Sequence, residues 1–178
     1  MQIKTHIGVS VDGFIATPDG WPALLSMPSF DGPRSFGHPE FIESCGAVVM
    51  GRTTFLPALG AADWPWPGYR VFVLTTRPLP PETPDDVVTA DDPAKLLELM
   101  QDADFEGDVH LVGGQRTIES FRAIGALDSF GVVTLPLLLG DGMRLTPPAG
   151  ERLLLKLESF RAFPDGAMEH IYTAATEG

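Results

Sequence analysis

Three short segments of the chain place glycine, threonine and arginine side by side. They read VMGRTTF (49–55), VLTTRP (73–78) and LVGGQRT (111–117). Each follows a run of apolar residues typical of a strand, and the first and third precede a segment with helical apolar spacing. Such a junction suits a phosphate group. Glycine lets the backbone come close, the free N–H groups of a helix start attract an anion, and threonine and arginine add donors.

The arginines of these segments belong to an acidic chain. Its 178 residues include 12 basic and 24 acidic side chains, which gives a formal net charge of −12. This balance argues against nucleic acid or a membrane surface as a partner. We therefore expect Arg52, Arg77 and Arg116 to serve a small polyanion, such as a dinucleotide with an extra phosphate. Taken singly, each junction is equally well a tight turn with a solvated arginine, and G-x-G-x-x-G is absent from the sequence, so other ligands stay open.

The elements that position these junctions follow from apolar periodicity and turn residues. Strands are predicted at 2–11, 14–16, 47–50, 70–75, 87–90, 109–112 and 129–140, the last broken at Pro136. Helices are predicted within 38–46, 51–59, 91–103 and 117–125, with Pro57 limiting the second or placing it late. Two further strands, 153–163 and 167–176, are joined by a hairpin at 164–166.

Strands and helices alternate through three quarters of the chain, and the last quarter is all strand. This order predicts an α/β fold with three layers, α/β/α, in which a mostly parallel sheet ends in a C-terminal antiparallel hairpin. Ligands of such sheets bind outside the carboxyl ends of the strands, so the three junctions line one crevice if their strands are neighbours. The length suits one domain over 1–178, and the long loop 17–37 is of a kind that is often functional.

Composition also indicates where the protein works. Cys45 is the single cysteine, so no internal disulfide can form. The first residues lack the apolar segment of a signal peptide, and no run reaches the roughly 20 apolar residues of a membrane span. We expect a cytoplasmic protein. The scattered histidines give no metal-site spacing, and His6 and His110, both in strands, are interpreted as structural.

Taken in order, the motifs resemble the dihydrofolate reductase fold. The closer resemblance is to the reductase domain at the C-terminus of bifunctional riboflavin-biosynthesis deaminase-reductases and to its stand-alone relatives. It rests on SVDGFIA (10–16), VVMGRTTF (48–55), VFVLTTRP (71–78), VHLVGGQRTIESF (109–121), LPLLLGDGMRL (135–145) and FPDGAMEHIYT (163–173). The resemblance implies an NADPH-dependent oxidoreductase that passes a hydride to a C=N or C=O carbon of a small heterocyclic substrate.

The resemblance also implies which residues hold the cofactor. The segment that binds its phosphates at a helix N-terminus corresponds to Gly51, Arg52, Thr53 and Thr54. The segment around the adenosine end and its 2′-phosphate corresponds to Leu74, Thr75, Thr76 and Arg77. The segment near the pyrophosphate and nicotinamide corresponds to Gly113, Gly114, Gln115, Arg116 and Thr117. Ile15 and Ala16 would border the nicotinamide, and the arginines favour NADPH over NADH.

The substrate side is less defined. Asp12 is our candidate catalytic residue, because its carboxylate could bind substrate hydroxyls or relay a proton, although an Asp-Gly pair is also a common turn. Asp31 or Glu40 could replace the acid that dihydrofolate reductases carry after the first loop. Val112 stands where riboflavin reductases commonly carry Glu. Three hypotheses remain: a 5-amino-6-(5-phosphoribosylamino)uracil reductase, a dihydrofolate reductase, and a non-catalytic NADP-binding module.

The apolar segment 129–140 bears on oligomeric state. In the riboflavin branch that the chain resembles, domains often pair through their sheet region, and SFGVVTLPLLLG is apolar enough to be such an interface. It could equally be a core strand. We expect a homodimer whose only other partner is a small-molecule substrate.

Overall fold

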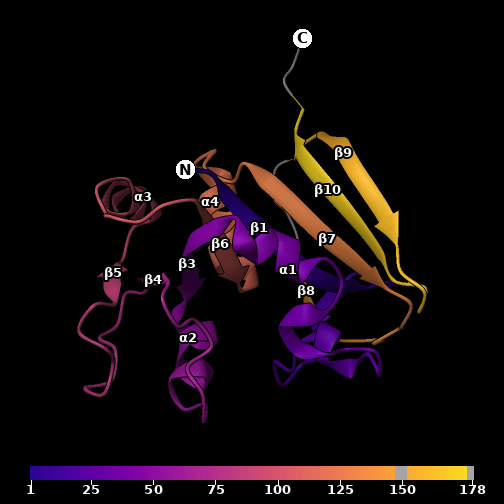
Figure 1. Cartoon of the computed structure of the whole chain (residues 1–178), viewed down its shortest axis with the longest axis horizontal. Coiled ribbons are helices and arrows are strands. Elements are labelled where there is room, and N and C mark those ends of the chain that lie inside the picture. Colours follow the sequence, from indigo (N-terminus) through magenta and orange to yellow (C-terminus); the bar gives the residue numbers. More distant parts are fainter. Residues whose placement is uncertain (147–151, 176–178) are drawn as a thin grey trace.

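An eight-stranded sheet organises the chain in the computed structural model, which describes residues 1–146 and 152–175 (Figure 1). Its strand order is β5-β4-β3-β6-β1-β7-β10-β9. The strands from β5 to β7 are parallel, and β10 and β9 add an antiparallel hairpin at one edge. The predicted α/β architecture, a mostly parallel sheet that ends in a C-terminal antiparallel hairpin, is thereby confirmed.

The bounds of the elements lie close to the predicted ones. The strands of the large sheet are β1 (Ile3–Ser10), β3 (Cys45–Gly51), β4 (Arg70–Leu74), β5 (Val88–Ala90), β6 (Asp108–Gly113), β7 (Ser129–Leu135), β9 (Leu155–Ala162) and β10 (Met168–Ala174). A two-stranded sheet pairs β2 (Phe14–Ala16) with β8 (Met143–Arg144). The helices are α1 (His38–Glu43), α2 (Arg52–Leu59), α3 (Pro93–Gln101) and α4 (Gln115–Ala123), with 3₁₀ turns η1 (Ala23–Ser26) and η2 (Gly32–Arg34).

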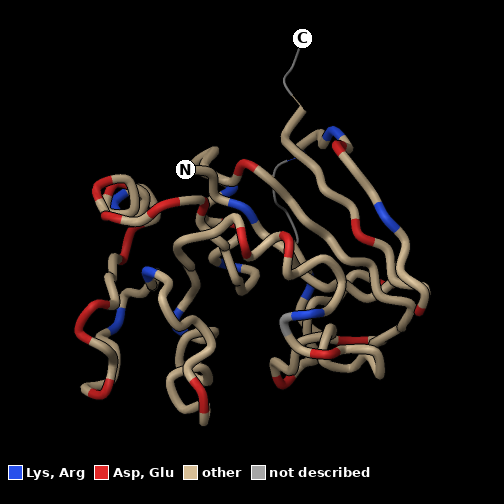
Figure 2. Tube along the Cα trace, in the orientation of Figure 1, with Lys and Arg blue, Asp and Glu red and all other residues tan. Residues whose placement is uncertain are grey.

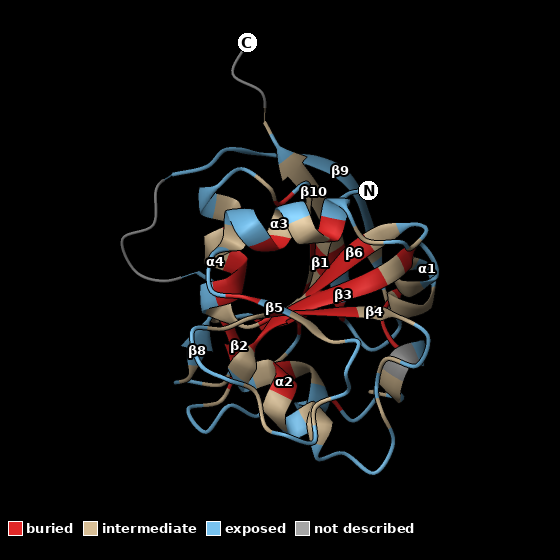
Figure 3. Ribbon diagram, turned by 90° about the vertical axis from the view of Figure 1, so that its left-hand side faces the viewer, coloured by how far each residue is buried: buried red, intermediate tan, exposed pale blue. Residues whose placement is uncertain are grey.

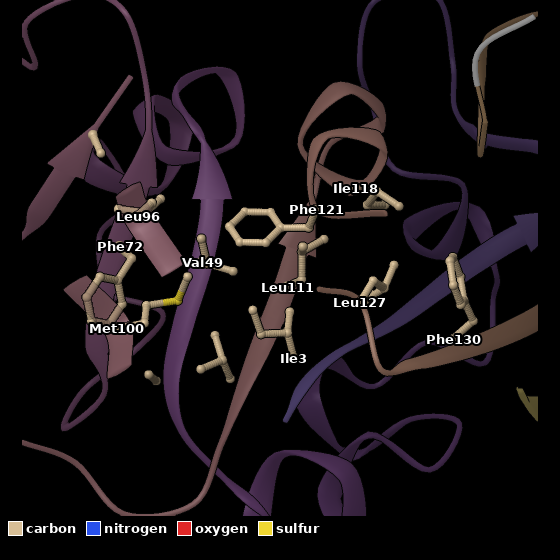
Figure 4. Packing of buried hydrophobic residues seen from close by; sticks show 13 residues of the cluster. Ile3, Val49, Phe72, Leu96, Met100, Leu111, Ile118, Phe121, Leu127 and Phe130 are labelled. Atoms are coloured by element: carbon tan, nitrogen blue, oxygen red, sulfur yellow. The ribbon is translucent and has the colours of Figure 1, made fainter. Parts of the chain in front are cut away.

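The alternation of side chains along the central strands creates the layers. In β3, Ala47 and Val49 pack with residues of α3 and α4, whereas Val48 and Met50 pack with Phe55 of α2 on the other face. Figure 3 shows the buried strands between helices, and Figure 4 shows the larger cluster, to which α4 contributes Ile118 and Phe121. All the strands that precede a junction are therefore covered on both faces, as parallel strands require.

Two details of the fold differ from the sequence prediction or settle it. Helix α2 begins directly after β3 and contains Pro57, since loss of one backbone donor does not end a helix that Phe55 anchors in the core. Strand β8, which pairs with β2, was not predicted from the sequence. The end of the last predicted strand, at residue 176, lies outside the described residues.

The first part of the segment predicted as either interface or core strand, 129–135, is internal. Strand β7 lies between β1 and β10 in the sheet, and Phe130, Val133 and Leu135 are buried. The strand ends before Pro136, because proline cannot donate a ladder hydrogen bond. The apolar character of 129–135 thus reflects its place in the sheet, whereas Leu138, beyond the strand, is 73% exposed.

Charge is distributed over the whole molecule. Figure 2 shows acidic residues on the loops and helices around the sheet, including the loops beside β4 and β5. Within the described ranges, no helix is long and apolar enough to cross a lipid bilayer.

Candidate functional site

The three glycine-, threonine- and arginine-bearing junctions meet at the side of the sheet where its parallel strands end, here called the carboxyl edge. Strands β4, β3 and β6 are direct neighbours, and the register pairs Gly51 with Leu74 and Met50 with Gly113. Because the three strands are parallel, their carboxyl ends lie together. The prediction of one crevice required that the strands before the three junctions be neighbours, and the structure shows that they are.

Two helices start at this edge from glycines. Gly51 is the N-cap of α2 and Gly114 the N-cap of α4, and neither helix receives a side-chain capping hydrogen bond. A Cβ atom on Gly51 would lie 2.5 Å from Oγ1 of the buried Thr117, so glycine is what allows α4 to pack against the end of β3. The first N–H groups of both helices are left for a ligand or solvent.

The three arginines at this edge are without ion-pair partners in the part of the chain that the structure describes. Nε of Arg52 is buried, and its N–H donates a hydrogen bond to no described group. The side chains of Arg77 and Arg116 are exposed. A buried guanidinium nitrogen without an acceptor is uncommon and is a natural partner for a phosphate oxygen.

Threonine side chains shape the same edge. Oγ1 of Thr75 donates to the carbonyl of Arg77 at 2.8 Å and accepts from the Arg77 N–H at 3.1 Å, which closes the loop after β4 into a tight turn. Thr53 and Thr76 are exposed, and Thr54 lies 3.8 Å from where a Cβ of Gly114 would be. The loop after β4 is thus held in shape, and the hydroxyls of the exposed Thr53 and Thr76 remain available to a ligand.

The double glycine lies beside the small sheet. Gly113 has a φ of +135° with open space where a side chain would be, and the peptide bond to Gly114 is cis. Sδ of Met143 lies 4.0 Å from the Cβ position of Gly114, and Met143 pairs with Ala16 of β2. Ile15 and Ala16 are therefore brought near the double glycine, although both are buried.

Strands β1 and β6 part at the same edge. Their pairing is limited to Ile3 with Val109 and Lys4 with His110, whereas β1 pairs with β7 from Lys4 to Ser10. From Thr5 onward the described part of β1 therefore has no ladder partner on its β6 side. The double glycine ends β6 where the two strands no longer pair.

Taken together, the donor set fits a phosphorylated dinucleotide. It combines open space beside Gly113, uncapped helix starts at Gly51 and Gly114, and an arginine nitrogen without an acceptor. These features suit a flat, polyanionic ligand that lies against the backbone.

Asp12 holds a loop in place. Its carboxylate accepts hydrogen bonds from Ser10 Oγ at 2.6 Å, Gly140 N at 2.7 Å and Leu139 N at 3.1 Å. The bond from Ser10, together with those from the two backbone amides, lowers the pKa of Asp12 to about 2. Asp12 is thus ionised at neutral pH, which suits a hydrogen-bond acceptor better than a proton donor. Its catalytic role stays a prediction.

Replacing Asp12 with Asn should flatten the acid limb of the stability curve. Because the folded pKa, about 2, lies below the ordinary 3.8, the charge of Asp12 adds stability above pH 3.8 that is lost as the pH falls through 2. The advantage of wild type over Asp12→Asn in urea unfolding should therefore shrink across this range. Asp85→Asn, on an exposed loop, is the control. An advantage independent of pH would contradict the assignment.

The two other candidate acids face away from the interior. Asp31 is exposed and pairs with Arg34 at 3.1 Å, and the exposed Glu40 lies 3.4 Å from Nη2 of Arg161. The bond to its own backbone N–H, and then that from Arg161, lowers the pKa of Glu40. Neither carboxylate lines either of the two cavities described below.

A cavity of about 190 Å³ lies on the α1 side of the sheet, beneath the predicted functional loop. Its floor is formed by His6 and Gly8 of β1 with Val133 of β7. Its other lining residues are Leu24, Phe30, Gly32, Ser35, Phe36 and His38. Gly8 keeps the floor open, since a Cβ there would lie 3.0 Å from Leu24. The lining is mostly apolar with a few polar groups, as is typical of a small-molecule site.

Sequence reasoning missed this cavity and its histidines. His6 was interpreted as structural, but the alternation of Lys4, His6, Gly8 and Ser10 along one face of a central strand was an available signal. Polar and small residues on a buried strand face indicate something other than apolar packing. Met143 could be found only from the pairing of two segments far apart in the chain.

A second cavity, of about 400 Å³, lies elsewhere. It is lined by Trp64 and Trp66 together with residues at the start of β4. The start of β4 lies at the opposite end of that strand from its junction. The rings of Trp64 and Trp66 pack edge to face, with their centroids 5.4 Å apart. No group of histidine, cysteine and acidic residues that could hold a metal ion occurs in residues 1–146 and 152–175.

Comparison with known proteins assigns the family. The sequence profile of the RibD C-terminal domain matches residues 2–168. The chain belongs to the RibD C-terminal domain family. Within this family the dihydrofolate reductase-like fold is the expected one, so the resemblance inferred from the motifs is confirmed.

Two relatives are matched over the full length of their chains. YwjB of Bacillus subtilis strain 168, an uncharacterized protein, is 25% identical over 178 residues, which are 98% of this chain and 100% of YwjB. A Shewanella sp. PV-4 structure assigned to riboflavin biosynthesis is also 25% identical, with a TM-score of 0.77 over 99% of this chain and 100% of that one.

Larger proteins share the fold. RibD of Acinetobacter baumannii superimposes with a TM-score of 0.72 at 17% identity, over 98% of this chain and 58% of RibD. A Thermotoga maritima diaminohydroxyphosphoribosylaminopyrimidine deaminase/5-amino-6-(5-phosphoribosylamino)uracil reductase gives 0.66 at 16% identity, over 98% and 56%. At these identities the likeness shows the fold alone.

Proposed function

We propose that this protein is an NADPH-dependent reductase of the riboflavin-biosynthesis type. It transfers a hydride to a C=N or C=O carbon of a small heterocyclic substrate. The observation that carries the proposal is the meeting of three Gly/Thr/Arg junctions at the carboxyl ends of β4, β3 and β6. Membership of the RibD C-terminal domain family supports it.

Each junction has a distinct part in the proposed cofactor site. Arg52 at the start of α2 and Arg77 in the loop after β4 read the 2′-phosphate, the first N–H groups of α2 bind another phosphate, and the double glycine accepts the pyrophosphate and nicotinamide. When bound, NADPH supplies the hydride. The chain's own residues align the two reactants and exclude water.

The cavity on the α1 side is the proposed acceptor site. Its floor residue Gly8 lies two positions before the end of β1, and β1 and β6 no longer pair at that level. At about 190 Å³ the cavity is smaller than the roughly 300–1,000 Å³ of drug-sized ligand sites. A single heterocyclic ring suits it better than a fused pterin, which favours a uracil-type substrate over dihydrofolate.

The test is NADPH oxidation at 340 nm with two substrates in parallel, 5-amino-6-(5-phosphoribosylamino)uracil and dihydrofolate. The proposal expects turnover with the uracil compound, at least about tenfold above any rate with dihydrofolate. Faster turnover with dihydrofolate would assign the alternative reductase activity. NADPH binding without turnover of either, or of other imines and carbonyls, would assign a non-catalytic module.

A further inference from the structure

The polar end of the acceptor cavity is built by residues far apart in the chain. Nε2 of His6 lies 2.8 Å from Oε1 of Glu169, and Oε2 of Glu169 accepts from Nε of Arg161 at 2.6 Å. The side chains of His6 and Glu169 are only 4% and 9% exposed. A buried carboxylate thus links a cavity-lining histidine to an arginine of the edge hairpin.

This linkage is fixed by its surroundings. The ring of His6 stacks on Phe41 with centroids 5.1 Å apart. Gly37, at the start of α1, leaves the space that Arg161 and Glu169 fill, since a Cβ there would overlap both. Burial alone would raise the pKa of Glu169, but the bonds from His6 and then Arg161 bring it below its ordinary value. Glu169 is therefore an anion held against the imidazole.

The neighbouring histidines lack such a partner. The ring of His38 lies 5.8 Å from that of His6, and His110 lies 5.7 Å from His38. Burial, and then the nearby His6, lowers the pKa of His38 to about 4, and burial above all lowers that of His110 well below its ordinary value. Both rings are neutral at pH 7. Among the described histidines that line the cavity, only His6 faces a carboxylate.

We propose that His6, held by Glu169, is the residue that hydrogen-bonds the heterocyclic acceptor in this cavity and gives it a proton. Nε2 of His6 bonds Glu169, so the second ring nitrogen, which bonds no described group, is the one for the acceptor. Glu169 and Arg161 are positioning residues that act through His6. This inference rests on the proposed reductase function and replaces Asp12, Asp31 and Glu40 as the proton source.

The step balances as an addition of two hydrogens. The acceptor carbon of the C=N bond takes the hydride, and the π-electron pair of that bond moves to nitrogen. For this step His6 acts as the imidazolium: its Nε2–H stays bonded to Glu169, its Nδ1 proton goes to the acceptor nitrogen, and the neutral ring then takes a proton from solvent. The acceptor is reduced to an amine while the nicotinamide is oxidised.

The test uses the four histidines as reporters and needs neither cofactor nor turnover. Imidazole ¹H–¹⁵N spectra of the whole chain are recorded during a titration with uracil. The signals of His6 and His38 should shift, and that of His170, in β10 and outside the cavity, should not. Shifts of His170 alone, or none at saturating uracil, would overturn the proposal.

Variants separate proton donation from simple structure. His6→Gln, which keeps a hydrogen-bonding side chain, should weaken uracil binding about tenfold or more. In NADPH oxidation it should lower kcat more than it raises KM and remove the wild-type pH dependence of kcat, as should Glu169→Gln with a smaller loss. His170→Gln is the control. Unchanged uracil binding and kcat in a folded His6→Gln would overturn the role of His6.

The two proposals fail in different ways. If NADPH is never oxidised but uracil shifts the His6 signal, the reductase function is wrong and the cavity assignment stands. If NADPH is oxidised by wild type and by His6→Gln at equal rates, the function stands and His6 is not the proton donor.

Discussion

Replacing Arg52 and Arg77 together with alanine should weaken NADPH binding by about 100-fold and NADH binding far less. Each arginine is expected to make a charge-assisted hydrogen bond worth about 1.5–3 kcal/mol, or about tenfold in affinity or more. NADH lacks the 2′-phosphate that the pair is proposed to read. Dissociation constants from nicotinamide fluorescence, for both cofactors and for each single variant, measure the effect.

The matched control for this pair is Lys156→Ala. Lys156 lies on β9, at the sheet edge farthest from β4, and its ion pair with Glu158 is exposed. Removing this charge should leave both affinities nearly unchanged, because exposed pairs contribute little. Equal losses for NADPH and NADH in the arginine variants would mean that these residues do not distinguish the cofactors.

The second large effect is expected at Gly51. An added methyl group would lie 2.5 Å from Oγ1 of Thr117, at the contact between β3 and the first turn of α4. Overpacking of this kind costs about 1–3 kcal/mol. Gly51→Ala should therefore lower the free energy of unfolding by that amount. It should also weaken the binding of NADPH, because α4 and the double glycine must shift.

A double variant tests this reasoning. Thr117→Ala removes the hydroxyl that an alanine at position 51 would meet, so Gly51→Ala/Thr117→Ala should recover most of the lost stability. Urea unfolding of the two single variants and the double gives the coupling energy. Additive losses would show that Gly51 is required for another reason, such as direct backbone contact with the ligand.

Much of the fold could be predicted because its parallel strands are short apolar runs with punctuation. The residues of β3, β4 and β6 read as strands because both faces are buried, and glycine ends two of them. The alternation of strand and helix then predicts a sheet whose ligand edge carries the junctions. Their adjacency followed from topology rather than from any single motif.

The acceptor side could not be predicted for a physical reason. His6, Glu169 and Arg161 lie on β1, β10 and β9, and only the antiparallel return of the C-terminal hairpin brings them together. Local patterns carry no information on such contacts. Asp12 and Glu40 were recognisable in the sequence because each has a local structural role. Asp12 accepts hydrogen bonds from the loop at Leu139 and Gly140, and Glu40 lies in the first turn of a helix, where a negative charge is favourable.

The most direct test of the central claim is a titration of the wild-type protein with NADPH, followed by nicotinamide fluorescence. The proposed site predicts saturable binding of one NADPH per chain at low micromolar concentration, tighter than NADH by about tenfold or more. Absence of binding at high micromolar NADPH would contradict the assignment of the three junctions as a dinucleotide site.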